Sequence, residues 1–147
     1  MKRTLALVLA IAAVGMAATV GSATPRSGAL HVTKECSQYD GDAGDFCTIT
    51  SSNINAIKAG STVVYASAAG DPTPGLLDSD LVIDGPGNNT AYGHVVLDLQ
   101  TGTGVVTLSG GTGKFRWFHA RVAVSPIGLP NFAWDGTYSF DPPGDKE

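Results

Sequence analysis

The residues best suited to chemistry are a histidine and an arginine two positions apart, His119 and Arg121, in the segment FRWFHARVAVSP. In a β-strand, side chains two residues apart point to the same face. Histidine can transfer a proton near neutral pH, and arginine can anchor a carboxylate or polarise a carbonyl. We therefore take His119 and Arg121 as candidate catalytic and ligand-binding residues, with Trp117 beside them as the apolar wall of the site.

The chain has two cysteines, Cys36 and Cys47. An isolated pair in an exported protein favours a disulfide over a metal site or a catalytic thiol. Closing so short a loop should stabilise the fold by roughly 2–3 kcal/mol in the chain-entropy account.

The loop between the cysteines carries Asp40, Asp42 and Asp45, which raises the possibility of calcium binding. An EF-hand loop needs a bidentate Glu at its twelfth position, where this chain has Ser51. The sequence therefore favours a solvated acidic loop, and we expect no metal site. The Gly-x-Ser-x-Gly pattern of serine hydrolases does not occur in the sequence either.

Short alternating or β-branched segments, separated by Gly- and Pro-rich turns, recur from residue 30 to residue 140. No segment has helical periodicity over ten residues. This pattern predicts an all-β protein, an eight-stranded antiparallel barrel or sandwich. The expected strands cover residues 30–36, 46–51, 61–69, 76–84, 92–100, 103–109, 114–124 and 132–140.

Two short turns set the expected register of the second half. A two-residue turn at Thr101-Gly102 pairs Gln100 with Thr103, and the loop 110–113 pairs Ser109 with Lys114. These registers separate an apolar face from a polar one, and a slip of one residue would mix the two. The inner set is Val95, Leu97, Leu99, Val106, Leu108, Phe115 and Trp117; the outer set is His94, Asp98, Thr107, Ser109, Lys114 and Arg116.

Continuing the same alternation along residues 114–124 puts His119 and Arg121 inside the barrel and Phe118, Ala120 and Val122 outside. Three interpretations stay open. The polar pair is one end of a working lumen, or it lies at the rim, solvated or paired with Asp135. Alternatively, a bulge between Trp117 and Ala120 reverses the alternation. An apolar outer face would indicate a partner surface, so we expect a homo-oligomer. His94 and His119 lie on opposite faces and should not share a zinc ion.

The N-terminus has the pattern of a secretory signal peptide. Lys2 and Arg3 precede an apolar run over residues 5–18, and small residues precede an expected cut after Ala23. That run is shorter than the ~20 residues of a membrane span. We expect residues 1–23 to be removed, residues 24–29 to be flexible, residues 30–140 to form one β-barrel domain and residues 141–147 to be a polar tail. The mature protein should be secreted and soluble rather than membrane-embedded.

The whole chain has 9 basic and 13 acidic residues and a formal charge of −4. Removing Lys2 and Arg3 leaves 7 basic residues against 13 acidic ones, a formal charge of −6. Nucleic acids and anionic membranes are bound by clustered Lys and Arg, so this balance excludes both as expected partners.

The phrases GGTGKF and WDGTYSF resemble those of the allene oxide cyclase barrel-like and dirigent-like proteins. The matching residues are Gly111, Thr112, Gly113, Lys114, Phe115, Gly136, Thr137 and Tyr138, and the resemblance covers roughly residues 60–140. It implies an eight-stranded antiparallel barrel, often a homotrimer. It also implies cyclisation of a small apolar substrate, or control of phenoxy-radical coupling, with no cofactor in the barrel.

Three functions follow from these expectations. The protein is a cofactor-free cyclase, isomerase or dirigent-type enzyme, a non-catalytic carrier of a small apolar molecule, or a structural barrel with a filled core. An eight-stranded barrel is just wide enough either to hold a ligand or to be filled by side chains. In the first two cases we expect Trp117, His119, Arg121 and Tyr138 to contact the ligand.

Overall fold

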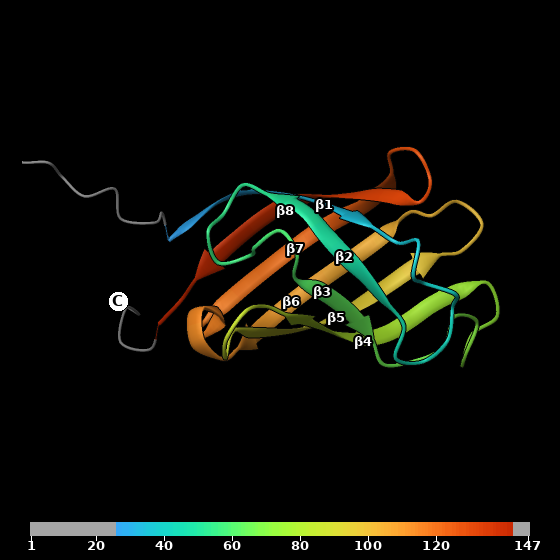
Figure 1. The fold of residues 1–147 in the computed structure, drawn as a ribbon, viewed down its shortest axis with the longest axis horizontal. Helices are drawn as coiled ribbons and strands as arrows, with labels where there is room; N and C mark the ends of the chain where they lie inside the picture. Colours follow the sequence, from blue (N-terminus) through green and yellow to red (C-terminus); the bar gives the residue numbers. More distant parts are fainter. Residues whose placement is uncertain (1–25, 143–147) are drawn as a thin grey trace, which may run out of the picture.

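The computed structural model describes residues 26–142 as one antiparallel β-barrel, closed by pairing of its first and last strands (Figure 1). Each strand pairs with the next along the chain, so the eight strands form a simple meander. The predicted fold class is confirmed. The elements are β1 (Ser27–Glu35), β2 (Phe46–Ser52), β3 (Thr62–Tyr65), β4 (Leu76–Asp84), β5 (Thr90–Asp98), β6 (Gly104–Gly111), the 3₁₀ helix η1 (Gly113–Phe115), β7 (Phe118–Pro126) and β8 (Asn131–Phe140).

The first strand begins earlier in the chain than we predicted. The predicted signal peptide and most of the predicted polar tail lie outside the described residues. β1 begins at Ser27, so residues 27–29, which we expected to be flexible, are paired with β8. Among residues 26–142 no helix has the length and hydrophobicity of a membrane span.

The register between β5 and β6 differs from the predicted one by two residues. Leu97 pairs with Gly104 and Val95 with Val106, so the connection is longer than a two-residue turn. The cause is Asp98, whose carboxylate accepts hydrogen bonds from the backbone N–H groups of Gln100 and Thr101 at 2.8 and 3.2 Å. A shift of two residues preserves the face, so Val95 and Val106 point inward as predicted. Leu99 falls in the loop and is exposed, against our prediction.

The register between β6 and β7 differs by five residues, which reverses the faces of β7. Ser109 pairs with His119 instead of Lys114, because residues 112–117 form η1 and a tight corner rather than a strand. Trp117 closes that corner in the left-handed region, at φ 65°. The corner docks on the preceding loop, where Asn89 Oδ1 accepts a hydrogen bond from the backbone N–H of Lys114 at 2.8 Å.

The predicted interior positions of His119 and Arg121 are therefore wrong. Both side chains are exposed, while the alternate residues of β7 are buried: Phe118, Ala120, Val122 and Val124. The reversal that we considered as an alternative is what occurs. The reversal of β7 also removes the apolar outer face from which we predicted a homo-oligomer. The homo-oligomer itself stays an untested prediction.

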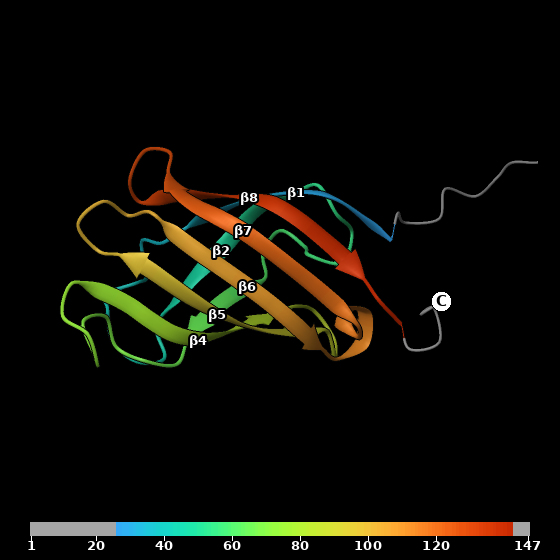
Figure 2. The same cartoon turned by 180° about the vertical axis from the view of Figure 1, so that it is seen from behind.

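Side chains fill the barrel. Trp134 at its centre is completely buried, and Tyr65, Leu30, Ile49 and Val63 surround the same core. One end is closed by a cluster of tilted and edge-on rings, in which the centroids of neighbouring rings lie 5.0–6.2 Å apart: Phe115, Phe118, Tyr138 and Phe140. Seen from behind, the long strands β4 to β8 run side by side across the molecule (Figure 2).

Candidate functional site

The site lies at the barrel end opposite the ring cluster, around Lys34 near the end of β1. Alternation along β1 points Leu30, Val32 and Lys34 inward, and all three are buried. The lysine is only 4% exposed. Since a lysine is rarely buried without a charged partner, its environment requires an explanation.

The Lys34 amine is hydrogen-bonded to the hydroxyl of Tyr65 on β3. Two other rings lie close to it: the Nζ atom is 5.0 Å from the ring centroid of Trp134 and 5.6 Å from that of Phe132. Phe132 is also the residue opposite Lys34 in the β1–β8 ladder. Closure of the barrel therefore assembles this cage from the first, third and last strands.

No carboxylate compensates the amine, since none of the ion pairs between described residues includes Lys34. Burial lowers the pKa of Lys34 from 10.5 to about 7, because the charged form loses its hydration. The facing rings favour the cation and offset part of this cost. At neutral pH the site therefore holds a large fraction of free amine, which is both a base and a nucleophile.

The neighbouring phenols remain protonated. Burial raises the pKa of Tyr65 strongly, and the nearby Tyr39 raises it further. Burial also raises the pKa of Tyr39, with smaller contributions from the charges of Asp45 and Asp42. Both hydroxyls can therefore donate a proton or a hydrogen bond at neutral pH.

A cavity of about 50 Å³ adjoins the Lys34 amine. Its lining is almost entirely apolar, although Lys34 and the two tyrosines contribute side chains to it. The volume exceeds that needed by one water molecule and suits a molecule of a few heavy atoms. The lining residues are Lys34, Cys36, Tyr39, Cys47, Tyr65, Leu77, Leu97 and Phe132.

Two polar atoms near this cavity have no hydrogen-bond partner among the described residues, Tyr39 Oη and Trp134 Nε1. Both atoms are buried, where an unsatisfied donor costs about 1–3 kcal/mol. Tyr39 also lines the cavity. Its hydroxyl is therefore a buried donor without a described partner, on a side chain that forms part of the cavity wall.

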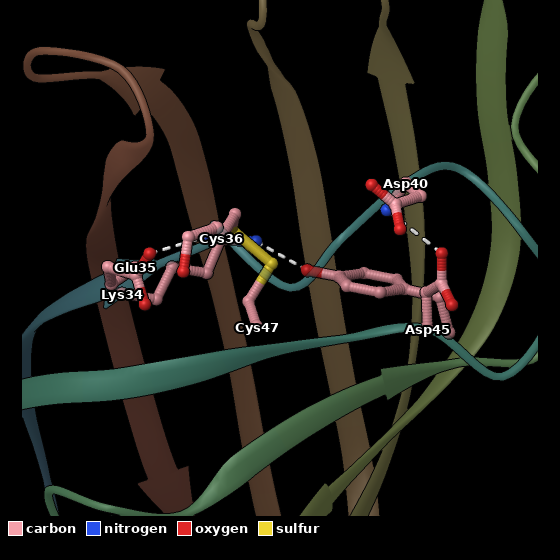
Figure 3. Close-up of a disulfide and its surroundings, with 8 residues drawn as sticks. Lys34, Glu35, Cys36, Asp40, Asp45 and Cys47 are labelled. Atoms are coloured by element: carbon pink, nitrogen blue, oxygen red, sulfur yellow. Dashed lines mark hydrogen bonds between the residues drawn. A yellow bond between two sulfur atoms is a disulfide. The ribbon is translucent and has the colours of Figure 1, made fainter.

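The predicted disulfide between Cys36 and Cys47 is confirmed, and it forms part of the cavity wall. Figure 3 shows it linking the chain after β1 to β2, with Lys34 close by. In the loop that it closes, the Asp45 carboxylate accepts a hydrogen bond from the backbone N–H of Asp40 at 2.9 Å (Figure 3). It also accepts one from the backbone N–H of Asp42 at 3.0 Å, so Asp45 shapes the loop. Within residues 26–142 no cluster of three or more His, Cys, Asp or Glu has metal-site geometry.

Three of the four residues that we predicted for the site are brought together, because His119, Arg121 and Tyr138 line one shallow surface groove, which Trp117 does not line. Trp117 is 43% exposed at the β6–β7 corner. His119 and Arg121 lie on the outer surface of β7, along a shallow groove of about 350 Å³. Tyr138 is buried in the ring cluster, at the opposite end from Lys34. None of the four lines the Lys34 cavity.

His94 lies on the outer face as predicted, between two aspartates of β4. Its Nδ1 is 2.8 Å from Asp80 Oδ1 and its Nε2 is 2.6 Å from Asp78 Oδ1. Hydrogen bonding to Asp80 raises the pKa of His94, partial burial lowers it, and Asp78 adds a further increase. Both ring nitrogens face carboxylates, so the cationic form fits this position.

Comparisons with protein-family models, with curated proteins and with solved structures found no match to this chain.

Sequence reasoning missed Lys34, although its signal is visible. In LHVTKEC the apolar residues Leu30 and Val32 alternate with polar ones, and the next inward position is Lys34, followed by Cys36. A charged residue in phase with a buried face is the kind of exception that marks a functional position. As residues for proton transfer or for binding a charged group, the prediction considered His94, His119 and Arg121, all in the second half of the chain.

Proposed function

We propose that this protein is a secreted binding protein that holds a small, largely apolar molecule with a hydrogen-bond acceptor in the cavity beside Lys34. The observation that carries the proposal is the buried Lys34 amine, which has no carboxylate among the described residues and adjoins a cavity with the unsatisfied Tyr39 hydroxyl. An apolar cavity with two donor side chains in its wall suits a short hydrocarbon that carries one oxygen.

Export is supported by the signal-peptide pattern and by the Cys36–Cys47 disulfide, which fits an oxidising compartment. The closed eight-stranded meander agrees with the resemblance to allene oxide cyclase barrel-like and dirigent-like proteins, although other families share this architecture. If the protein is a cofactor-free cyclase or isomerase, Lys34 and Tyr65 are better placed for acid–base roles than the exposed His119 and Arg121.

A second candidate is a purely structural barrel. The observation that favours it is the filled interior, in which Trp134, Tyr65 and Phe118 occupy the central space. A large apolar ligand of the kind expected from the resemblance does not fit a cavity of about 50 Å³.

Titration with butanone, followed by NMR, separates the two candidates. Binding predicts saturable shifts of the methyl groups of Leu77 and Leu97, which line the cavity. Leu97→Phe should fill the space and abolish the shifts. Val96→Phe, on the adjacent outward-facing position that is 44% exposed, should leave them intact. The absence of saturable shifts in the wild-type protein would favour the structural barrel.

A further inference from the structure

We propose that Lys34 forms a reversible imine with a small aldehyde or ketone that enters this cavity. The inference rests on the proposed binding function and names its ligand class as carbonyl compounds of a few heavy atoms.

The geometry brings together a nucleophile and two proton donors. Lys34 and Tyr65 are directly hydrogen-bonded, and Tyr39 packs edge-on against Tyr65 with ring centroids 5.3 Å apart. All three side chains line the same cavity. A carbonyl carbon at the amine would lie beside the Tyr65 hydroxyl, and the buried Tyr39 hydroxyl is a second donor without a described partner in the same wall.

The reaction balances without any oxidant, reductant or metal. The Nζ lone pair attacks the carbonyl carbon, the C–O π bond breaks, and the oxygen takes up a proton to give a carbinolamine. The nitrogen then loses its second proton, a C=N bond forms, and the oxygen leaves as water. Tyr65 can donate a proton to the leaving oxygen and regain one from the nitrogen, so its protonation state is unchanged overall.

The surroundings also favour the product over a free ammonium ion. When the imine nitrogen takes up a proton from solvent, the resulting cation spreads its charge over carbon and nitrogen and depends less on water than an ammonium group. The rings of Trp134 and Phe132 have their centroids 5.0 and 5.6 Å from the nitrogen position and stabilise such a cation. The remaining wall, from Leu77 and Leu97, accommodates the hydrocarbon part.

The protonation state of the Lys34 amine at pH 7 also favours formation of the imine. An exposed lysine amine with its ordinary pKa near ~10.4 is almost entirely protonated at pH 7 and does not attack carbonyls. The pKa of Lys34, lowered by burial to about 7, leaves much of it unprotonated at that pH.

The test is reductive trapping of the full protein with propanal and sodium cyanoborohydride at pH 7, followed by peptide mapping. The exposed Lys58 and Lys114 serve as internal controls. We expect Lys34 to be alkylated at least about tenfold faster than either, because a drop of one pKa unit raises the free-amine fraction about tenfold. Leu97→Phe should suppress labelling of Lys34, and Val96→Phe should not. Tyr65→Phe should slow it while leaving Lys58 unaffected.

Each other outcome overturns the inference. An unlabelled Lys34, or one labelled no faster than Lys58 and Lys114, means that the amine has no special reactivity. If butanone still produces saturable shifts at Leu77 and Leu97 in that case, the binding function stands and only the imine is wrong. If both the shifts and the labelling are absent, both proposals fail.

Discussion

Lys34 is the residue at which strand pattern and side-chain chemistry conflict most. Its place on β1 is fixed by Leu30 and Val32, which must face the core, so the lysine is carried inward with them. An amine buried without a carboxylate costs stability that a neutral side chain of similar length would not. A residue kept at such a cost is more readily explained by function than by folding.

We predict that Lys34→Met stabilises the protein at pH 6 and that the gain disappears as the pH rises. The lowered pKa means that between about pH 7 and pH 10.5 the unfolded chain binds a proton that the folded chain lacks. In that window the wild-type protein gains stability with rising pH, by about 1 kcal/mol per pH unit from this residue. Below pH 7 Lys34 is protonated in both the folded and the unfolded protein. The burial of its charge then lowers the free energy of unfolding by its full amount. Urea unfolding at several pH values measures the difference.

Lys58→Met is the matched control, since Lys58 is exposed. Its stability difference from the wild-type protein should change little between pH 6 and pH 10. An equal pH dependence in the two variants would show that Lys34 is not desolvated as the structure indicates.

His94 provides a prediction on the outer surface. We expect its pKa, measured by NMR, to lie above 6.5 in the wild-type protein and to fall in Asp80→Asn, because the hydrogen bond to Asp80 is the largest cause of the increase. A histidine whose pKa is raised in the folded state contributes stability below pH 6.5 and loses it as the pH rises through the folded value. An unchanged titration curve in Asp80→Asn would contradict this assignment.

At the scale of the strands, alternation predicts much of the fold. β4 begins and ends where its alternating pattern does, with Leu77, Leu81 and Ile83 inside. Register could not be predicted equally well, because it depends on corners rather than strands. The β6–β7 corner contains a 3₁₀ turn and a left-handed tryptophan, neither of which has a propensity signal. A corner that takes up an odd number of extra residues moves His119 and Arg121 from the inside to the outside.

The pairing of strands that are distant in the sequence explains why the site could not be predicted from the sequence. Alternation on β1 could indicate that Lys34 points inward. Its partners come from β3 and β8, and Phe132 is 98 residues away along the chain but directly opposite in the closing ladder. Only the closure of the barrel, which no local pattern specifies, brings these residues to one place.

We predict that Gly136→Ala destabilises the barrel by about 1–3 kcal/mol, the usual cost of overpacking. A Cβ atom at Gly136 would lie 2.0 Å from the carbonyl oxygen of Arg121, so β7 and β8 would have to separate. The control is Gly28→Ala on the neighbouring strand, where the added atom would make ordinary contact with Tyr138 at 3.4 Å. Thermal melts of the two variants measure the effect, and equal melting temperatures would contradict the close approach of β7 and β8.

At the scale of the whole molecule, the disulfide connects the site to the stability of the barrel. We predict that the double variant Cys36→Ala, Cys47→Ala loses roughly 2–3 kcal/mol of unfolding free energy, the value expected for so short a loop. Because both cysteines line the cavity, the variant should also weaken butanone binding. Urea unfolding and the NMR titration measure the two effects, and a variant as stable as the wild-type protein would contradict the first.

The closing ladder has a mechanical consequence. Ser27, the first residue of β1, lies opposite Ser139, near the last residue of β8. The barrel domain therefore begins and ends on the same side of the barrel. A pulling force applied to the two chain ends would therefore load the pairs of this ladder one after another, as in a zipper, instead of shearing them all together. The ladder would open from Ser27 toward Glu35, so Lys34 would be among the last residues exposed. Peeling β1 further would then stop at Cys36, which is tied to β2. A barrel with a packed core would thus still yield to tension along its seam, and it would keep the amine covered until the seam is almost fully open.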